Sequence, residues 1–161
     1  MKKYETVAVG GTFDEFHKGH RILISKAFEI GKKVFIGLCT DEFARELMKP
    51  HEIASYENRK RILFEFLKDR GLLKRAEIIP LDDPYGLTVT DPNLEALVVS
   101  KETEARALKI NEIRKLRGLP PIDIIVIDMV LAEDGIDIST TRIHKHEIDH
   151  EGRLLKKIRR S

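Results

Sequence analysis

The chain has 161 residues, of which 42% are apolar and 35% charged, and its 29 Lys and Arg nearly balance its 27 Asp and Glu. This length suits one globular domain that buries roughly 70% of the surface exposed by its unfolded chain. The net charge of +2 argues against a general nucleic-acid-binding protein, which would carry a clear basic excess. The single cysteine, Cys39, excludes an internal disulfide and is expected in the core.

The start of the chain shows no signal-peptide pattern, because Met1–Tyr4 leads into a short strand-like run and not into a long apolar stretch. The longest apolar runs are far too short to span a bilayer. We therefore expect a cytoplasmic protein without a membrane partner. The oligomeric state is not predicted.

Apolar runs alternate along the chain with helical patterns. Strands are expected at Thr6–Val9, Val34–Cys39, Ala76–Ile79, Ala96–Val99 and Ile124–Met129. Helices are expected at Lys18–Ile30, Asp41–Met48, Glu57–Arg70 and Thr103–Arg117, with a short one after Ser139 and a last one near Arg153. β-Branched runs that are apolar on both faces are typical of parallel strands buried between helices. The sequence therefore predicts an α/β fold: a single Rossmann-like, doubly wound domain over residues 1–161, with a five-stranded parallel sheet and helices on both faces.

Ligands of open parallel sheets bind outside the carboxyl ends of the strands. In this chain the rule points to three segments, Gly10–Asp14, Thr40–Asp41 and Ser100–Lys101. We expect the site residues to gather there.

The first of these segments opens the motif G-G-T-F-D-E-F-H-K-G-H, which runs from Gly10 to His20. Gly10 and Gly11 let the backbone turn and approach a ligand closely. Free N–H groups and the dipole at the start of the following helix favour phosphate. His17 and His20 project from one face of that helix. Their spacing could also be half of a metal site, with only Asp14 near enough in sequence to be a third ligand. The strand–glycine–helix context favours phosphate.

Arg59 lies on the apolar stripe of the helix predicted from Glu57, in its first turn. A guanidinium at the inner end of such a stripe needs an anion, either a substrate phosphate or a carboxylate such as Glu57 or Asp69. Lys49, in the loop before Pro50, is either a second cation of the site or a solvated lysine. Both alternatives stay open.

Lys101 follows the predicted strand Ala96–Val99 and is a candidate contact for a triphosphate, whereas Thr103 serves at least as a cap of the next helix. Asp82 and Asp83 resemble a carboxylate pair, but they precede a proline and are more typical of a turn.

A second polar helix start lies in Ile138–Ile143, which reads I-S-T-T-R-I. Ser139 is a good N-cap, and Thr140, Thr141 and Arg142 fill the first turn. Capping requires Ser139 alone, so the additional hydroxyls, free N–H groups and arginine indicate a second anion site.

His144, His146 and His150 follow this motif and suggest a metal site. His146 and His150 would share one face of a helix, but His144 and His146 would point apart. We therefore predict no metal ligands here.

Gly10–His20 together with Ile138–Ile143 resembles the nucleotidyltransferase superfamily, which carries H-x-G-H near its N-terminus and I-S-S/T-T near its C-terminus. Within that superfamily, Val98–Glu104, Lys109–Arg114 and Gly118–Asp128 resemble the archaeal-type phosphopantetheine adenylyltransferases. The resemblance covers nearly the whole chain. It implies transfer of AMP from ATP to 4'-phosphopantetheine, giving dephospho-coenzyme A and pyrophosphate. Its implied partners are the small molecules ATP, accompanied by Mg²⁺, and 4'-phosphopantetheine. Nucleic acid is not an implied partner.

The same resemblance implies a role for each matching residue. His17 and His20 would contact the ATP phosphates and stabilise charge at the α-phosphorus, and Lys49 would bridge this phosphate and that of the acceptor. Gly19 would leave room for the nucleotide. The other implied nucleotide contacts are Gly10, Gly11, Thr12, Phe13 through its backbone N–H, Asp14, Ser139, Thr140, Thr141 and Arg142. Thr12 is also assigned to the acceptor, and looser assignments place Arg59 at the acceptor and Lys101 at the triphosphate.

Several other functions compete with this interpretation. A cytidylyltransferase of the superfamily also carries I-S-T-T, but usually directly after R-T-x-G-I, where this chain has Ala132–Asp137. A nicotinamide-mononucleotide adenylyltransferase matches less well through the middle of the chain. A nucleotide sensor or nucleic-acid-binding protein of the same fold is disfavoured by the intact polar set and the small charge. No Walker motif or G-x-G-x-x-G occurs, and the chain is too short for a class I aminoacyl-tRNA synthetase. Thr140 stands where the family more often has serine, and its hydroxyl is kept.

Overall fold

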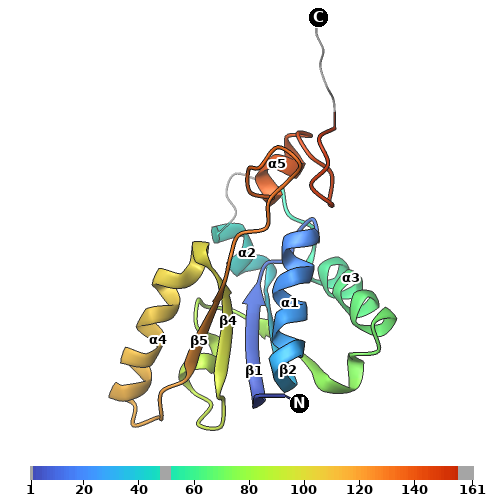
Figure 1. Ribbon diagram of the computed structural model, residues 1–161. Helices are drawn as coiled ribbons and strands as arrows, with labels where there is room; N and C mark the ends of the chain where they lie inside the picture. The colour runs from blue at the N-terminus through green and yellow to red at the C-terminus, as the bar shows by residue number, and fades with distance from the viewer. Residues whose placement is uncertain (1, 48–51, 156–161) are drawn as a thin grey trace, which may run out of the picture.

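The computed structural model describes residues 2–47 and 52–155, which form a parallel sheet flanked by helices (Figure 1). The strands of this sheet have the order β3-β2-β1-β4-β5. They are β1 (Tyr4–Gly11), β2 (Gly31–Cys39), β3 (Ala76–Leu81), β4 (Ala96–Ser100) and β5 (Asp123–Ile127). Each lies within a few residues of its predicted bounds, and the predicted doubly wound α/β fold is confirmed.

β1 occupies the centre of the sheet, with β2 paired on one side and β4 on the other, both parallel to it. Along the chain, β2 and β3 are added successively on one side of β1, and β4 and β5 are then added on the opposite side. The strand order therefore reverses beside β1, and in such sheets a crevice opens at the carboxyl ends of the strands on either side of the reversal.

The helices also lie close to their predicted positions. They are α1 (Lys18–Ile30), α2 (Asp41–Leu47), α3 (Tyr56–Asp69), α4 (Glu104–Leu116) and α5 (Thr140–His144). Short 3₁₀ turns occur at η1 (Leu73–Arg75), η2 (Gly86–Val89) and η3 (Lys101–Thr103). Among the described residues, no helix combines the length and the apolar character that crossing a membrane would require.

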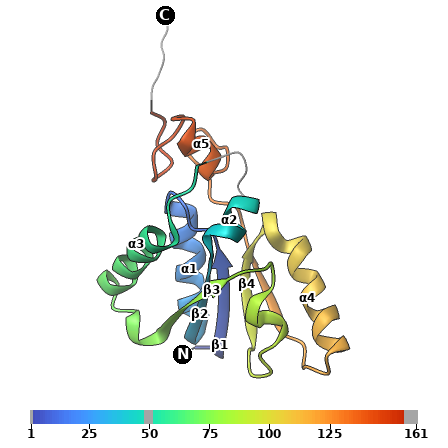
Figure 2. The ribbon, with the colours of Figure 1, turned by 180° about the vertical axis from the view of Figure 1, so that it is seen from behind.

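Alternate residues of the central strand face opposite helices. Val7 and Val9 belong to a buried cluster with residues of α1 and α3, whereas Ala8 between them packs with Ala107 and Ile110 of α4. The two-residue period of a strand causes this alternation. Helices α1 and α3 thus cover one face of the sheet, and α4 with η2 covers the other (Figures 1 and 2).

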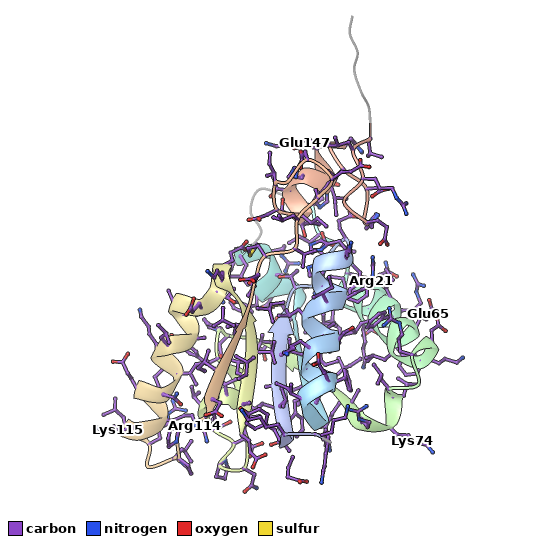
Figure 3. All side chains as sticks on the ribbon, viewed as in Figure 1. Arg21, Glu65, Lys74, Arg114, Lys115 and Glu147 are labelled. Carbon is purple, nitrogen blue, oxygen red and sulfur yellow. The ribbon has the colours of Figure 1, made fainter. Side chains whose placement is uncertain are left out.

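Arg114 is fully buried between α4 and the loops at the end of the sheet remote from α5 (Figure 3). Its guanidinium donates to the backbone carbonyls of Thr88, Asp91 and Pro120 at 2.6–2.9 Å. These bonds satisfy carbonyls that the sheet leaves unpaired, and they join the connection between β3 and β4 to the loop between α4 and β5.

The segment after β5 crosses the carboxyl end of the sheet and folds into a small cap around α5 (Figure 1). The cap has its own apolar centre, formed by Ala132, Ile138, Ile143 and Ile148. It contacts the start of α1, because the Lys18 N–H donates to the carbonyl of His150 at 2.8 Å and Arg21 pairs with Glu151.

The helix predicted near Arg153 is wrong for the residues described there. Ile148 and Leu154 instead form an antiparallel bridge. The Asp149 carboxylate accepts the N–H groups of Glu151 and Arg153, and Gly152 has a φ of 83°, so the intervening chain is a turn.

Candidate active site

The loop from β1 to α1 has an unusual backbone. Phe13 and Glu15, neither of them glycine, have φ values of 51° and 50°. This left-handed region is costly for side chains with a Cβ, and residues held there cluster at functional sites. Phe13 is buried and its ring meets that of His20 edge-on, with ring centroids 5.3 Å apart. The loop conformation therefore helps to hold His20.

His17 and His20 cap the start of α1 reciprocally. The Nδ1 atom of His17 accepts the Gly19 N–H, and the Nδ1 atom of His20 accepts the N–H of His17, both at 3.1 Å. The two rings stack with centroids 3.6 Å apart. Because both Nδ1 atoms accept, the neutral rings carry their hydrogens on Nε2. Each histidine thus has an Nε2–H donor that the cap does not use.

Burial keeps both imidazoles uncharged near neutral pH. It lowers the pKa of His17 from 6.5 to about 4, with smaller effects from nearby His150 and Arg21. It also places the pKa of His20 well below 6.5, with smaller effects from nearby His17, Arg21 and His150. The pair therefore provides neutral hydrogen-bond donors in the free protein.

The depressed pKa of His17 predicts a pH-dependent stability. Below pH 6.5 the unfolded chain takes up a proton on His17, whereas the folded chain does so only near pH 4. The free energy of unfolding should therefore fall as the pH drops from 6.5 to about 4. Urea titrations at several pH values should show a weaker dependence in His17→Asn than in the original chain. Identical dependences would exclude a contribution from His17.

Gly19 gives space to a histidine ring. A Cβ at this position would lie 2.9 Å from Cε1 and 3.1 Å from Nδ1 of His17, so the ring would have to move away from it. The sequence predicts room for the nucleotide here; the observed neighbour is the imidazole. Glycine is required because the ring lies over the backbone N–H that it accepts.

The second polar helix start lies directly beside this loop. Ser139 is the N-cap of α5, and its Oγ accepts the Arg142 N–H at 3.2 Å. Thr140 donates its hydroxyl to the carbonyl of Asp14 at 3.3 Å, although 126 residues separate the two in sequence. The two motifs are thereby joined in space.

A cavity of about 480 Å³ opens between the two helix starts. Its size lies within the range of sites for small-molecule ligands. The predicted residues that line it are Gly10, Gly11, Thr12, Phe13, Asp14, His17, Gly19, His20, Ser139, Thr140 and Thr141. It extends between the carboxyl ends of β1 and β4, at the reversal of strand order. The structure therefore brings the two motifs into one site.

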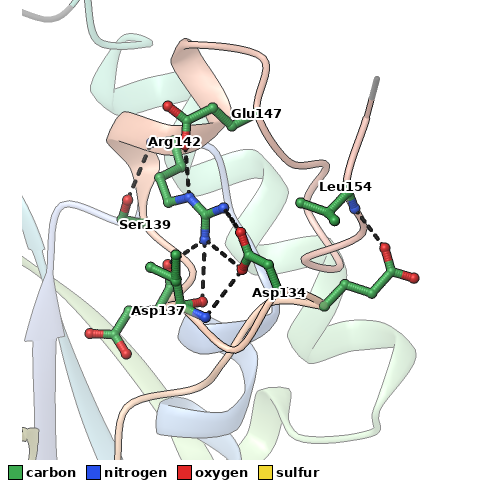
Figure 4. Close-up of polar contacts among 8 residues, drawn as sticks. Asp134, Asp137, Ser139, Arg142, Glu147 and Leu154 are labelled. Carbon is green, nitrogen blue, oxygen red and sulfur yellow. Dashed lines mark hydrogen bonds and ion pairs between the residues drawn. The ribbon is translucent and has the colours of Figure 1, made fainter. Parts of the chain in front are cut away.

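Arg142 does not line this cavity. Its guanidinium pairs with Asp134 at 2.5 Å and Glu147 at 2.9 Å and also donates to the carbonyls of Ile136 and Asp137 (Figure 4). The hydrogen bond from Arg142 lowers the pKa of Asp134 below its ordinary value. Arg142 thus links the loop before α5 to Glu147, three residues after this helix, and its contact with phosphate stays a prediction.

Lys101 is exposed and also lies outside the cavity lining, and its assignment to the triphosphate stays a prediction. It begins η3, a tight turn that puts other side chains toward the cavity. Ser100, Thr103 and Arg106 line the cavity from this edge. Arg106 is a cation that sequence reasoning missed, and its place at the start of the helix after β4 is the signal that could have found it. Lys49 lies outside the described residues.

Arg59 is buried and engages the backbone, and its assignment to the acceptor stays a prediction. Its guanidinium donates to the carbonyls of Ala54, Thr12 and Cys39 at 2.8–2.9 Å and pairs with Asp41 at 3.1 Å. The anion that it needs is therefore a carboxylate, though neither Glu57 nor Asp69. Arg59 is not among the cavity-lining residues, and it acts by joining the loops after β1 and β2.

Arg59→Met should lower the free energy of unfolding by about 3 kcal/mol, because it leaves buried carbonyls without donors. Arg61→Met is the matched control in the same helix. Arg61 pairs with Glu65, and both side chains are about 60% exposed. Its replacement should change stability by less than about 0.5 kcal/mol. Urea denaturation measures both values, and equal losses would contradict the assigned role of Arg59.

Comparisons with known proteins identify the family of this chain. The sequence model of the family described as Cytidylyltransferase-like matches residues 8–146. A phosphopantetheine adenylyltransferase of Methanothermobacter thermautotrophicus is 52% identical over 158 residues, which cover 98% of this chain and 94% of the relative. A phosphopantetheine adenylyltransferase of Pyrococcus horikoshii is 42% identical, with 97% of this chain and 98% of the relative covered.

Solved structures share the architecture. A protein of unknown function from Archaeoglobus fulgidus has a TM-score of 0.70 at 33% identity, covering 86% of this chain and 100% of the other. A tyrosyl-tRNA synthetase of the same organism has a TM-score of 0.62 at 12% identity over 88% of this chain and 60% of the other, a likeness of fold alone. The extent and identity of the sequence matches show that this chain belongs to the cytidylyltransferase-like nucleotidyltransferases and, among them, to the phosphopantetheine adenylyltransferase family.

Proposed function

We propose that the protein transfers the adenylyl group of ATP to 4'-phosphopantetheine, forming dephospho-coenzyme A and pyrophosphate in the synthesis of coenzyme A. The main structural support is the convergence of the His17–His20 pair and the Ser139–Thr141 helix start on one cavity. The names of its relatives support the choice of reaction. Because the reaction consumes ATP, we place the protein in the cytoplasm.

In the proposed reaction an oxygen of the phosphopantetheine phosphate forms a bond with the α-phosphorus of ATP. The bond from this phosphorus to the bridging oxygen breaks, and pyrophosphate leaves with the electron pair. The acceptor phosphate is itself a nucleophile, so no general base is needed. Positioning and electrostatic stabilisation are the main requirements of such a transfer. These requirements match a cavity lined with hydrogen-bond donors.

Each group of site residues would have a different role in this transfer. The Nε2–H groups of His17 and His20 would donate to oxygens of the α- and β-phosphates, where negative charge increases during transfer. The N–H groups and hydroxyls at Ser139–Thr141 would bind the β- and γ-phosphates. Gly10 and Gly11 would bring the backbone close, and Thr12 and Phe13 would lie beside the phosphates. Lys49 would bridge the two reacting phosphates.

Magnesium is expected to accompany ATP and to neutralise phosphate charge. The carboxylates that line the cavity include Asp14, Glu102 and Asp128. Asp14 is buried and accepts the Ala54 N–H at 3.1 Å, while Glu102 and Asp128 are exposed. This scattered set fits an ion that keeps water and substrate phosphates as ligands, as Mg²⁺ usually does. Asp128 is exposed and directly follows β5, whose last residue lines the cavity, so it would contribute one ligand.

The proposal is tested by measuring pyrophosphate release with ATP or CTP and three acceptors: 4'-phosphopantetheine, nicotinamide mononucleotide and glycerol phosphate. We expect release only with ATP and 4'-phosphopantetheine, and mass spectrometry should identify dephospho-coenzyme A. Activity with CTP and glycerol phosphate would instead assign a cytidylyltransferase. Activity with nicotinamide mononucleotide would assign the sibling adenylyltransferase.

A further inference from the structure

Carboxylates and imidazoles cluster where the loop after β1 meets the cap. The Nε2 atom of His144 lies 3.2 Å from Oδ2 of Asp14 and 3.8 Å from Oε2 of Glu15. One ligand atom from each of these three residues lies within 4.8 Å of the others. The Nε2 atom of His150 lies 2.9 Å from the other Glu15 oxygen. Residues separated by about 130 positions thus form one group of nitrogen and oxygen donors.

A second cavity, of about 330 Å³, opens at this cluster. Its polar lining is formed by Glu15, His144, His146, Asp149 and His150. α5 ends at His144, and His146 has a φ of 59°, so the chain turns sharply there. The prediction that these histidines would point apart assumed a continuing helix. The turn brings His144, His146 and His150 to the same cavity instead.

The donor spacing suits a small divalent cation. Zn²⁺ binds imidazole nitrogen and carboxylate oxygen at about 2.0–2.2 Å, so neighbouring ligand atoms of a tetrahedral site lie about 3.3 Å apart. The distances of 3.2 Å and 3.8 Å from His144 to the two carboxylates need only small adjustments to reach this value. A mixed set of imidazole and carboxylate favours first-row transition metals, unlike the all-oxygen surroundings of Mg²⁺.

The surrounding contacts orient the ligands. Oδ1 of Asp14 accepts the Ala54 N–H at 3.1 Å, which turns Oδ2 toward His144. His150 holds the Oε1 atom of Glu15 and leaves Oε2 directed at His144. Such outer contacts are typical of metal sites, where they fix the orientation of each ligand.

We propose that Asp14, Glu15 and His144 bind a divalent transition-metal ion such as Zn²⁺, with His150 orienting Glu15. The bound ion joins the loop between β1 and α1 to the end of α5. It therefore stabilises the contact between the two halves of the ATP-binding cavity, which Asp14 also lines. Because a ligand that binds only the folded state stabilises it, added Zn²⁺ should also raise the midpoint of thermal unfolding.

The test is a metal titration of the chelator-treated full chain without nucleotide. Zn²⁺ binding is measured by calorimetry, and Co²⁺ is used as a spectroscopic probe of coordination. We expect one equivalent to bind. His144→Gln should weaken binding by at least about tenfold, since even the loss of an outer contact costs about 10–100-fold. His146→Gln, a change to the same residue type in the same cavity, is the matched control and should bind as the original chain does.

Glu15→Gln is a second variant for the case that His144→Gln fails to fold, and it should weaken binding to a similar degree. Circular dichroism establishes whether each variant is folded. Equal affinity in the original chain, His144→Gln and Glu15→Gln would overturn the proposal, as would the absence of a one-to-one complex. Binding that is lost in His17→Gln but kept in His144→Gln would move the metal to the cavity histidines and likewise overturn it.

Discussion

Replacing His20 with alanine is expected to lower kcat for adenylyl transfer by about 100–1000-fold, the usual cost of removing one preorganised donor to developing charge. The imidazole is held by His17, Phe13 and the loop, with its Nδ1 atom occupied by the His17 N–H. Its Nε2–H is thus already aimed when the triphosphate binds. Steady-state pyrophosphate release with ATP and 4'-phosphopantetheine measures the effect.

Two conservative variants distinguish the role of His20 as a hydrogen-bond donor to phosphate from its role as a helix cap. In His20→Asn the amide oxygen takes roughly the place of Nδ1 and keeps the capping bond, but no donor reaches the place of Nε2. In His20→Gln the longer side chain can put an amide N–H near that place. We expect Gln to restore more of kcat than Asn does, with circular dichroism unchanged for both. Full activity in the Asn variant would mean that His20 acts only as a helix cap.

Gly19→Ala is expected to lower kcat about 100-fold while leaving the fold intact. In a helix, alanine is favoured over glycine by about 1 kcal/mol, which opposes any loss of stability. The new Cβ would, however, lie 2.9 Å from Cε1 of His17 and force the ring to move. Displacements of about 1 Å in an active site can cost 100-fold in rate. Thermal unfolding and kcat, measured on the same preparation, should therefore change independently.

A double-mutant cycle tests whether Gly19 acts through His17. In a His17→Ala background the added methyl group has no ring to displace, so Gly19→Ala should then have little further effect on kcat. The coupling between the two substitutions should account for most of the loss seen in Gly19→Ala alone. Additive losses would show instead that the methyl group obstructs the nucleotide directly, as the resemblance to the family implies.

Local patterns in the sequence were sufficient for the elements around this site. The bounds of α1 agree with the prediction because its buried stripe of Ile24, Ala27 and Phe28 repeats with helical spacing. The N-cap His17 directly precedes this helix. The parallel sheet follows from β-branched runs that alternate with helices. Both signals depend on neighbours within a few residues, so the chain order alone carries them.

Arg59 and Arg142 show the limit of prediction from local sequence patterns. Sequence correctly required an anion for Arg59, but its partners include Asp41 and the backbone carbonyls of Thr12 and Cys39, which lie 18 to 47 residues away along the chain. Arg142 likewise pairs with Asp134 and Glu147 and not with the cavity. A cation at a helix start has the same sequence pattern whether it holds a phosphate or a loop. Only the distances between distant segments distinguish the two cases.

The sequence by itself determined the doubly wound fold, the two polar helix starts and the family, because hydrophobic periodicity and short motifs are local properties of the chain. The tertiary structure decided which side chains meet. It placed His17, His20 and Ser139–Thr141 around one cavity, removed Arg59, Arg142 and Lys101 from its lining, and joined Asp14 and Glu15 to His144. These meetings depend on how strands and loops far apart in sequence pack, and no local pattern specifies such contacts.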